Sequence, residues 1–582
     1  MTLNAAQTTL DGLMSYGQYT AVEADGTTQG YQELSRDIED LASLLRLRYG
    51  LEAGESLLVT SHHSPTTVKI MLACVRAGLT YVPVPVDTPS SRVRSIRHAV
   101  KATAHATAVN GNLTIERLPR HADWHSPTFK KTSTIPLSVL HTSGSTGVPK
   151  SVVIASGNID HFISWCRDTL PLSPKDRVAM LSPLHFDLCT HDIFHGLGSG
   201  ATLVFPSEIE RINPQAAARF VLDSDITRIY MVPTFLEHVA VAVIRTNRSA
   251  LSVDTVMFAG ERLSERGLKA ARRAFPNARF FNLYGPIETN VITGMEVTSE
   301  FAYDSSNVGP PLPNVKLAVM KSDNSIVSSG RGELIVAGSA VTPGYIDDTH
   351  NKGKFVLEKG DRYYRTGDEA TLRRNWVHLH GRIDNMIKLR GQRVELDEVE
   401  RVVRSVEEIE QAAVIPSEPG DALEAYVTTS LLQSSPTVRQ QTVTTVVNRC
   451  RAVLPAVAVP AVVQVLGSMP VTLTGKVNRQ ALKATRTSDC AQGISDVNKA
   501  VGEKTNVTEA IEHFLLARLN CERSALRSIR SLKEHPGFNS MVAAECIEAV
   551  EDLVGRSANY HKLSSTSLDS IESIGELFEE HE

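Results

Sequence analysis

The chain has few cysteines, little aromatic content, no long apolar run and no excess of basic residues. Its 582 residues include seven cysteines and carry a formal net charge of −5 at pH 7. That charge gives no basic field for nucleic acid. No apolar run approaches the roughly 20 residues of a membrane span, and the first residues lack the regions of a signal peptide. We therefore expect a cytoplasmic protein with no membrane and no nucleic-acid partner.

The cysteines are scattered and form neither CxxC pairs nor a cluster with histidine along the chain. This pattern favours a reducing compartment over a disulfide framework or structural zinc. The seven positions are Cys74, Cys166, Cys189, Cys450, Cys490, Cys521 and Cys546.

Apolar periodicity predicts an α/β fold. Ser56–Ser61 is typical of a buried strand, Thr67–Ala77 of the helix after it, and Tyr81–Val84 of the next strand. This βαβ alternation predicts a mostly parallel sheet covered by helices, and it continues to about residue 300. Shorter, turn-rich β segments follow, then a small α+β module over about 410–485 and a helical tail. Residues 487–506 are polar and aperiodic, which is typical of a linker.

The stretch Leu140–Lys150 reads LHTSGSTGVPK. Its glycines allow positive φ and close approach of the backbone, and its hydroxyls and lysine add donors and one positive charge. Such a loop can cradle phosphate, although its spacing is not that of a Walker motif. The alternative is a Ser/Gly turn between two strands.

Four further stretches follow in order. They read NLYGPIET (Asn282–Thr289), YRTGD (Tyr364–Asp368), GRIDNMIKLRGQRVELDE (Gly381–Glu398) and TLTGKVNR (Thr472–Arg479). With the first loop, this set resembles the adenylate-forming superfamily, which comprises acyl-CoA synthetases, luciferases and the adenylation domains of nonribosomal peptide synthetases. The resemblance runs from about residue 20 to 485. It implies a large multi-subdomain α/β domain (1–383) and a smaller, mobile α+β domain (384–486) that hinges at Asp384.

The resemblance also implies ATP and Mg²⁺ as cofactors. Glu288 is similar to the magnesium ligand, a role that suits a hard carboxylate oxygen. Asp368 is similar to the ribose-binding aspartate, and Lys476 to the catalytic lysine that bridges the substrate carboxylate and the α-phosphate. The implied ATP-binding set is Thr142, Ser143, Gly144, Ser145, Thr146, Gly147, Lys150, Tyr284, Gly285, Asp368 and Arg382, with Lys476, Glu288 and Arg382 as the catalytic residues.

Three positions depart from the family pattern. Ile287 replaces a threonine that contacts phosphate, Ser151 replaces a glycine, and Ser156 replaces a histidine. Loss of one hydroxyl hydrogen bond at Ile287 costs about 1 kcal/mol, which affects the rate more than the existence of activity.

In amino-acid-activating members, an aspartate in the segment that matches Ser182–Gly198 pairs with the α-ammonium of the substrate. Asp187 matches this aspartate, and a cationic partner would offset the cost of burying it. Alternatively, Asp187 caps the following helix. The remaining pocket positions map to Leu188, His191, Tyr230, Met257, Ala259, Leu283, Val291 and Ile292. This lining resembles that of prolyl-activating enzymes. Proline or a proline-like amino acid is therefore the leading substrate, and a small amino acid such as alanine is the alternative.

The tail, residues 507–582, resembles a helical carrier-protein domain. Ser540 matches the serine that carries phosphopantetheine, although Asn539 replaces the usual aspartate before it. A small helical docking domain is the alternative. The expected partners are thus an amino acid, a carrier domain in cis or in trans, and a phosphopantetheinyl transferase.

Three functions remain open at this point. The first is an AMP-forming ligase that loads an amino acid onto a carrier thiol in nonribosomal-peptide-type biosynthesis of natural products. The second is an acyl-CoA ligase that uses free CoA. The third is a degenerate, non-catalytic homologue.

Overall fold

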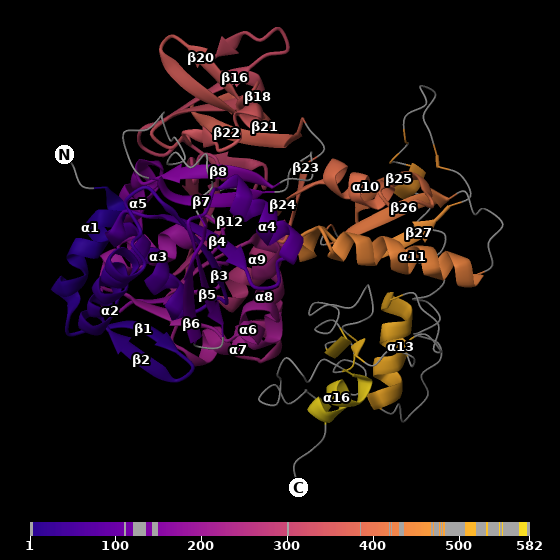
Figure 1. Cartoon of the computed structure of the whole chain (residues 1–582), viewed down its shortest axis with the longest axis horizontal. Coiled ribbons are helices and arrows are strands. Elements are labelled where there is room, and N and C mark those ends of the chain that lie inside the picture. The colour runs from indigo at the N-terminus through magenta and orange to yellow at the C-terminus, as the bar shows by residue number, and fades with distance from the viewer. Residues whose placement is uncertain are drawn as a thin grey trace. The chain divides into compact units, whose positions relative to one another are not determined.

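The structure is a computed structural model of the whole chain (Figure 1). It describes residues 4–109, 112–119, 136–142, 149–298, 302–383, 386–417, 420, 422–429, 436–466, 469–470, 477, 479, 481–483, 507–519, 526, 531–532, 546–547, 550 and 570–578. The chain forms two compact units, of which the first comprises residues 1–207 and 218–394 and the second comprises 208–217 and 395–582. In the described part of the chain, no helix has the length and apolarity needed to cross a membrane.

The first unit contains an eight-stranded sheet whose inner strands are parallel. The β1–β2 and β13–β14 pairs at its two edges are antiparallel. The strand order is β14 (Thr293–Glu296), β13 (Arg279–Tyr284), β12 (Thr255–Ala259), β11 (Arg228–Met231), β9 (Arg177–Ala179), β10 (Thr202–Phe205), β1 (Thr20–Ala24) and β2 (Thr27–Gly30).

A second sheet in this unit has parallel strands at its centre. Its order is β19 (Gly344–Tyr345), β8 (Lys150–Ala155), β7 (Pro136–Thr142), β4 (Thr80–Pro85), β3 (Ser56–Ser61), β5 (Ala104–Val109) and β6 (Asn112–Arg117). Strand β3 pairs in parallel with β4 and β5, as the βαβ pattern predicts. Strands β7 and β8 are instead antiparallel, so residues 143–148 connect the two strands of a hairpin.

Helices and helical turns alternate with these strands along the chain, and residues 208–217 among them belong to the second unit. The helices are α1 (Ala5–Gly12), α2 (Tyr31–Ser43), α3 (Pro65–Ala77), α4 (Ser90–Ala99), α5 (Gly157–Thr169), α6 (Glu208–Ile212), α7 (Pro214–Asp223), α8 (Pro233–Arg245) and α9 (Glu265–Ala274), and the turns are η1 (Leu13–Tyr16), η2 (Leu44–Arg48) and the π-helical η3 (His191–Gly196).

The ends of α3 follow from its sequence. The side chain of Ser64 caps its first turn by accepting from Thr67 N, and Pro65 occupies the first helical position. Gly78 ends the helix with a φ of 72°, which favours glycine.

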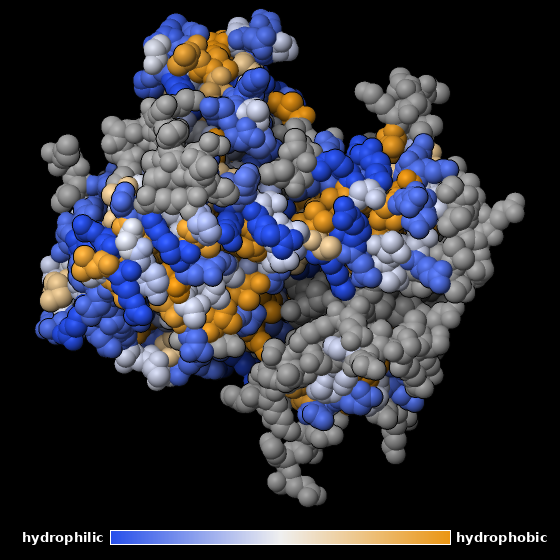
Figure 2. All heavy atoms as spheres, viewed as in Figure 1, coloured by the Kyte–Doolittle hydropathy of each residue, from blue (hydrophilic) through white to orange (hydrophobic). Residues whose placement is uncertain are grey.

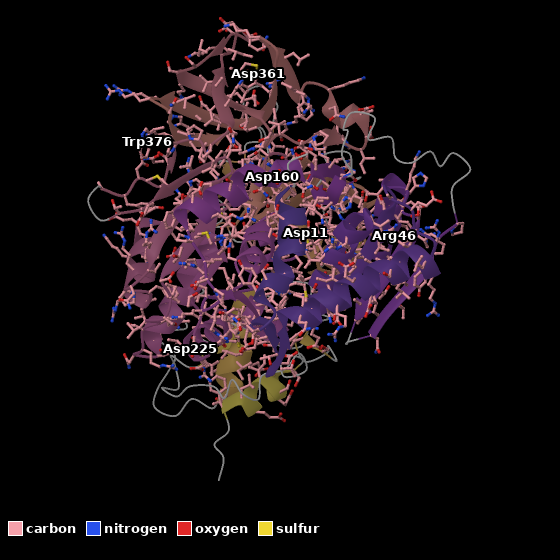
Figure 3. The ribbon with its side chains drawn as sticks, turned by 90° about the vertical axis from the view of Figure 1, so that its left-hand side faces the viewer. Asp11, Arg46, Asp160, Asp225, Asp361 and Trp376 are labelled. Atoms are coloured by element: carbon pink, nitrogen blue, oxygen red, sulfur yellow. The ribbon has the colours of Figure 1, made fainter. Side chains whose placement is uncertain are left out.

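A hydrogen bond links α1 to α5, because the Asp160 side chain accepts from Ala5 N at 2.7 Å. Figure 3 labels Asp160 on α5 and Asp11 on α1.

On the visible surface of the first unit, polar residues are interspersed with smaller apolar patches (Figure 2).

An antiparallel sheet completes the first unit, at the top of Figure 1. Its order is β15 (Asn307–Gly309), β22 (Trp376–Arg382), β21 (Asp361–Arg373), β18 (Gly330–Gly338), β16 (Val315–Met320) and β17 (Ile326–Val327), with β20 (Phe355–Glu358) paired to β21. The turn η4 (Asp348–Asn351) precedes β20, and the two-stranded ribbon β23 (Met386–Leu389) and β24 (Gln392–Glu395) follows β22.

The second unit begins as the small α+β module expected from the sequence. It comprises α10 (Leu396–Arg404), β25 (Ile409–Pro416), β26 (Leu423–Thr429), α11 (Pro436–Arg451), η5 (Ala456–Ala458) and β27 (Val462–Val465), and the three strands form one sheet. Glu400, on the helix, accepts from Val414 N at 2.9 Å and from Arg479 at 2.6 Å, which ties α10 to β25.

The tail contains α13 (Val507–Leu519), α16 (Ile571–Gly575) and η8 (Glu576–Phe578). Ile511, Leu515, Ile574 and Phe578 are buried together with Cys546, Ile547 and Val550 in one apolar cluster. The tail therefore has a hydrophobic core of its own. Most of residues 539–554, among them Asn539 and Ser540, lie outside the described residues. The predicted α/β class, with a large first domain and a smaller second one, is confirmed; the domain boundaries stay a prediction.

Candidate active site

Several predicted site residues lie outside the described part of the chain. They are Ser143, Gly144, Ser145, Thr146, Gly147, Asp384, Lys476 and Ser540. The two ends of the glycine-rich loop are described, because Thr142 on β7 pairs directly with Lys150 on β8. The hairpin register thus fixes where the loop leaves and rejoins the sheet.

Asp368 lies between Tyr284 and Arg382. It accepts from the Tyr284 hydroxyl at 2.6 Å and from Arg382 Nη1 at 3.1 Å. Asp368 and Arg382 are direct cross-strand partners of β21 and β22, which explains their contact. Arg382 also donates to Thr366 O at 2.9 Å. Three residues predicted to bind the nucleotide, from three motifs, are therefore in contact.

Gly285 follows Tyr284 and occupies a position that only glycine fits. A Cβ there would lie 1.6 Å from Asn290 O. Ile292 N donates to Tyr284 O at 2.8 Å, so the segment 285–291 folds back onto the end of β13. The glycine of the YGP motif is needed for this fold-back.

Glu288 lies on this folded-back segment and is almost fully buried. Its two carboxylate oxygens lie 2.8 and 2.7 Å from Arg393 Nη1, and Oε1 accepts from the Tyr345 hydroxyl at 2.7 Å. Thr342 N donates to Glu288 O at 2.7 Å. Both oxygens of the predicted magnesium ligand therefore face a cation in this structure.

These neighbours set the protonation of Glu288. Burial by itself would raise the pKa of its carboxyl, but the charge of Arg393 and the Tyr345 hydrogen bond outweigh burial and lower that pKa. The carboxylate in turn raises the pKa of Arg393 despite burial of the guanidinium. Glu288 is thus held as the anion.

Arg393 belongs to the ribbon β23–β24, which makes a second contact within the first unit. Gly391 N donates to Glu261 Oε1 at 2.8 Å, while Glu261 Oε2 accepts from the Thr234 hydroxyl at 2.6 Å. Arg393, Lys388 and Tyr345 are site residues that the sequence reasoning missed. The charged run that contains RGQRVE was the available signal for the first two.

Side chains predicted to line the acid pocket lie on one face of the eight-stranded sheet. Tyr230 is directly opposite Met257, and Ala259 is directly opposite Leu283. Met257 and Ala259 are two residues apart on β12, so all four side chains point to the same face. They share one buried core cluster with Val291 and Ile292, and Leu188 packs against it. The His191 ring lies edge-on to Tyr230, with centroids 6.0 Å apart.

Asp187 lies in the turn before η3 and is partly buried. Burial raises the pKa of its carboxyl, and the positive charges of Lys388 and Arg393 offset part of that rise. A cation is therefore favourable next to this carboxylate, and its role toward an ammonium group stays a prediction.

Comparison with known proteins decides the family. The family model described as "AMP-binding enzyme" matches residues 13–346, which is more than half of the chain. The family model described as "AMP-binding enzyme C-terminal domain" matches residues 398–476. The chain belongs to the AMP-binding enzyme family. The resemblance to adenylate-forming enzymes of the amino-acid-activating branch is thereby confirmed, as is the prediction of an enzyme.

Relatives of this AMP-binding enzyme include D-alanine–D-alanyl carrier protein ligases. That of Listeria monocytogenes serotype 4b (strain F2365) is 26% identical over 488 residues, covering 80% of this chain and 96% of the relative. That of Bacillus cereus (strain B4264) is 28% identical over 471 residues, covering 78% and 93%.

Solved structures share the fold. The Vibrio cholerae adenylation domain AlmE, in complex with glycyl-adenosine-5′-phosphate, superposes with a TM-score of 0.72 at 23% identity and covers 84% of this chain and 98% of its own. Holo-PA1221, an NRPS protein that contains adenylation and PCP domains, has a TM-score of 0.75 at 19% identity and covers 98% of this chain and 96% of its own.

Proposed function

We propose that this AMP-binding enzyme uses ATP to adenylate an amino acid and then transfers the aminoacyl group to the thiol of a carrier-bound phosphopantetheine. The observation that carries the proposal is the convergence of Tyr284, Asp368 and Arg382 in one hydrogen-bonded group. Relatives that are named as ligases of D-alanine and a carrier protein support both half-reactions.

In the first half-reaction, a carboxylate oxygen of the amino acid attacks the α-phosphorus of ATP, and pyrophosphate leaves. Asp368 would accept hydrogen bonds from the ribose hydroxyls, oriented for this by Tyr284 and Arg382. Glu288 offers hard carboxylate oxygens that fit Mg²⁺, which when bound neutralises phosphate charge. Lys476 would stabilise the charge that develops at the α-phosphate.

In the second half-reaction, a thiolate attacks the acyl carbonyl carbon, and AMP leaves with the electron pair of the broken C–O bond. The thiol would be that of phosphopantetheine on Ser540 or on a separate carrier protein. A phosphopantetheinyl transferase would install it on the serine. The tail's own apolar cluster supports a folded domain there.

We infer that the substrate is a small, largely apolar amino acid, with its ammonium group at Asp187. Tyr230, Met257 and Leu283 are fully or almost fully buried on one sheet face and restrict the space for a side chain. Because the relatives are named as ligases of D-alanine, we favour alanine over proline as the substrate. Proline, which the resemblance of the pocket lining suggested, is the alternative that the experiment below includes.

The experiment is amino-acid-dependent exchange of labelled pyrophosphate into ATP across a panel of D- and L-alanine, glycine, proline and a fatty acid. We expect exchange with a small amino acid and none with the fatty acid. Exchange with the fatty acid alone would favour the CoA ligase alternative. Absence of exchange with every acid would favour the non-catalytic homologue.

A mass measurement after treatment with phosphopantetheinyl transferase and CoA locates the thiol. We expect the chain to gain the phosphopantetheine mass and the variant Ser540→Ala to gain none. An unmodified wild-type chain would mean that the thiol resides on a separate carrier.

A further inference from the structure

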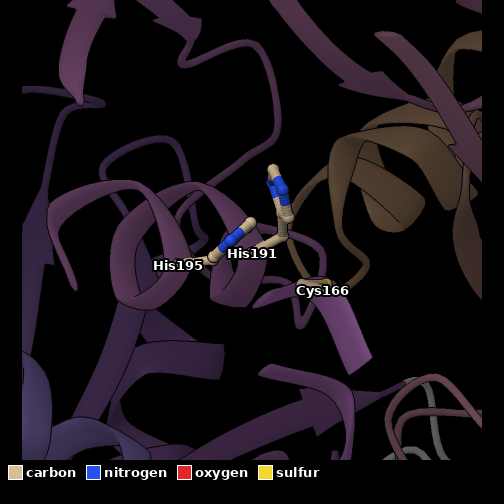
Figure 4. Close-up of side chains that lie close together, drawn as sticks. All are labelled: Cys166, His191 and His195. Carbon is tan, nitrogen blue, oxygen red and sulfur yellow. The ribbon is translucent and has the colours of Figure 1, made fainter. Parts of the chain in front are cut away.

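Three potential metal ligands from two helical elements meet in the core of the first unit. Cys166 lies on α5, and His191 and His195 lie on η3 (Figure 4). One ligand atom from each residue, the cysteine sulfur or a ring nitrogen, lies within 4.8 Å of the other two. All three side chains are completely buried.

The local backbone creates this arrangement. His191 and His195 are four residues apart on the π-helical turn, so both project from one side of it. Their ring centroids are 5.0 Å apart. Helix α5 packs against η3 and brings Cys166 next to the two rings. Short π-helical stretches are frequent at functional sites.

Several ring nitrogens of the two histidines form no hydrogen bond in the described part of the chain. Among the described residues, His191 Nε2 and both ring nitrogens of His195 have no hydrogen-bond partner. Leaving a buried polar atom unpaired costs about 1–3 kcal/mol. Three such atoms close together therefore indicate that a ligand binds there. The Cys166 sulfur, beside them, is a soft donor.

A carboxylate orients one of the rings. Asp192 Oδ1 lies 3.0 Å from His191 Nδ1, and both side chains are fully buried. This contact leaves Nε2 of His191 facing away from the carboxylate as the available nitrogen. A histidine that donates one N–H to a carboxylate while its other nitrogen is free is the arrangement found at protein-bound metals.

We propose that Cys166, His191 and His195 form a binding site for a borderline-soft divalent metal ion, with Zn²⁺ as the best match. Thiolate and imidazole donors suit zinc, whereas Mg²⁺ prefers oxygen, so this site is separate from that of the nucleotide's magnesium. Three protein ligands leave a fourth position of a tetrahedron for water or another donor.

Binding makes one metal–sulfur and two metal–nitrogen bonds and releases the Cys166 proton to solvent. Ligand atoms around a tetrahedral zinc are roughly 3.5 Å apart, given bonds of about 2.0–2.3 Å. Since the three atoms lie within 4.8 Å of one another, they draw together by at most roughly 1 Å. Among the described residues, neither ring nitrogen of His195 has a hydrogen bond that this movement would break.

The test measures metal in the full chain, expressed with zinc, purified and freed of loosely bound ions by gel filtration. We expect about one zinc per chain by elemental mass spectrometry, and a loss of at least tenfold in bound zinc for Cys166→Ala and for His195→Ala. Cys74→Ala is the matched control, because Cys74 is also a free, fully buried cysteine of this unit, on α3. The control variant should keep its zinc.

Two further measurements separate metal binding from misfolding. Added Zn²⁺ should raise the Tm of the metal-free wild type and of C74A but not that of C166A. Replacement by Co²⁺ should give a thiolate-to-metal charge-transfer absorption that C166A lacks. A wild type that binds no zinc under supplementation, or a C166A variant that folds and binds as much zinc as wild type, would overturn the proposal.

Discussion

Arg393 and Glu288 form a buried ion pair in which Nη1 of the arginine lies 2.8 and 2.7 Å from the two carboxylate oxygens. The arginine thereby covers the oxygens that the proposed function assigns to Mg²⁺. A metal ion and this guanidinium cannot both occupy the same oxygens. We expect Arg393 to give up at least part of this contact when a magnesium nucleotide binds.

Replacement of the arginine tests this competition. Arg393→Gln should lower the Mg²⁺ concentration needed for half-maximal pyrophosphate exchange severalfold, because no cation has to be displaced. The variant should also unfold at a lower temperature without Mg²⁺, since removal of one partner of a buried pair costs about 3–5 kcal/mol. Arg331→Gln, which removes an exposed ion pair with Glu369, is the control. An unchanged Mg²⁺ dependence in R393Q would argue against Glu288 as the metal ligand.

The pair also predicts a pH dependence of stability. The pKa of Glu288 is lowered from 4.5 in the folded chain, mainly because Arg393 outweighs the effect of burial. Its stabilising contribution is therefore fully present above pH about 4.5 and is lost as the pH falls through the lower folded-state pKa. The difference in unfolding free energy between wild type and Glu288→Gln should shrink below pH about 4.5. A difference that stays constant from pH 7 to pH 3 would contradict the pKa shift.

The hydroxyl of Tyr284 should matter for ATP binding through Asp368. Tyr284→Phe keeps the ring and removes a 2.6 Å hydrogen bond to the carboxylate. Loss of a hydrogen bond to a charged group costs about 1.5–3 kcal/mol, so we expect KM for ATP to rise at least tenfold while KM for the amino acid changes little. Tyr303→Phe, which loses a hydrogen bond to Leu263 O, should leave both unchanged. Equal changes in the two KM values in Y284F would show a general structural effect.

Gly285 should be intolerant of any side chain. In Gly285→Ala the new Cβ would overlap the carbonyl oxygen of Asn290, which only a backbone shift can relieve. We expect a loss of about 3 kcal/mol in stability, together with weaker ATP binding. Gly12→Ala is the control, since no atom lies within 4 Å of a Cβ there, and its Tm should stay the same or rise slightly. A G285A variant with wild-type Tm would mean that the fold-back of residues 285–291 is wrong.

Asp187 should recognise the ammonium group of the substrate. Asp187→Asn should raise KM for the activated amino acid at least tenfold, about 1.4 kcal/mol, with little change for ATP. The exposed Asp168→Asn, on α5, serves as the control for charge. The variant should also discriminate less well than wild type between alanine and propionate, which lacks the ammonium group. Full discrimination in D187N would assign the aspartate to capping the helix that follows it.

Much of the site was readable from the chain because short motifs fix local backbone. The motif NLYGPIET contains Tyr284, Gly285 and Glu288, and the stretch Leu140–Lys150 was expected either to cradle phosphate or to turn between two strands. Both patterns depend on near neighbours. The amino-acid-activating branch could also be inferred, since Asp187 stands in a recognisable segment.

Contacts between distant segments could not be read in this way. Arg393 meets Glu288 across 105 residues, and Tyr345 meets it across 57. A charged residue in a polar run gives no sign of its partner, because the partner depends on how the ribbon β23–β24 lies against the sheets.

The sequence by itself determined the family, the α/β class and the identity of most nucleotide-site candidates, because these depend on local patterns of glycine, charge and apolar periodicity. Only the tertiary structure decided that Cys166 lies beside His191 and His195, since the scattered cysteines had argued against a zinc site. Packing of α5 against η3 creates that cluster, and packing couples residues without regard to their spacing along the chain.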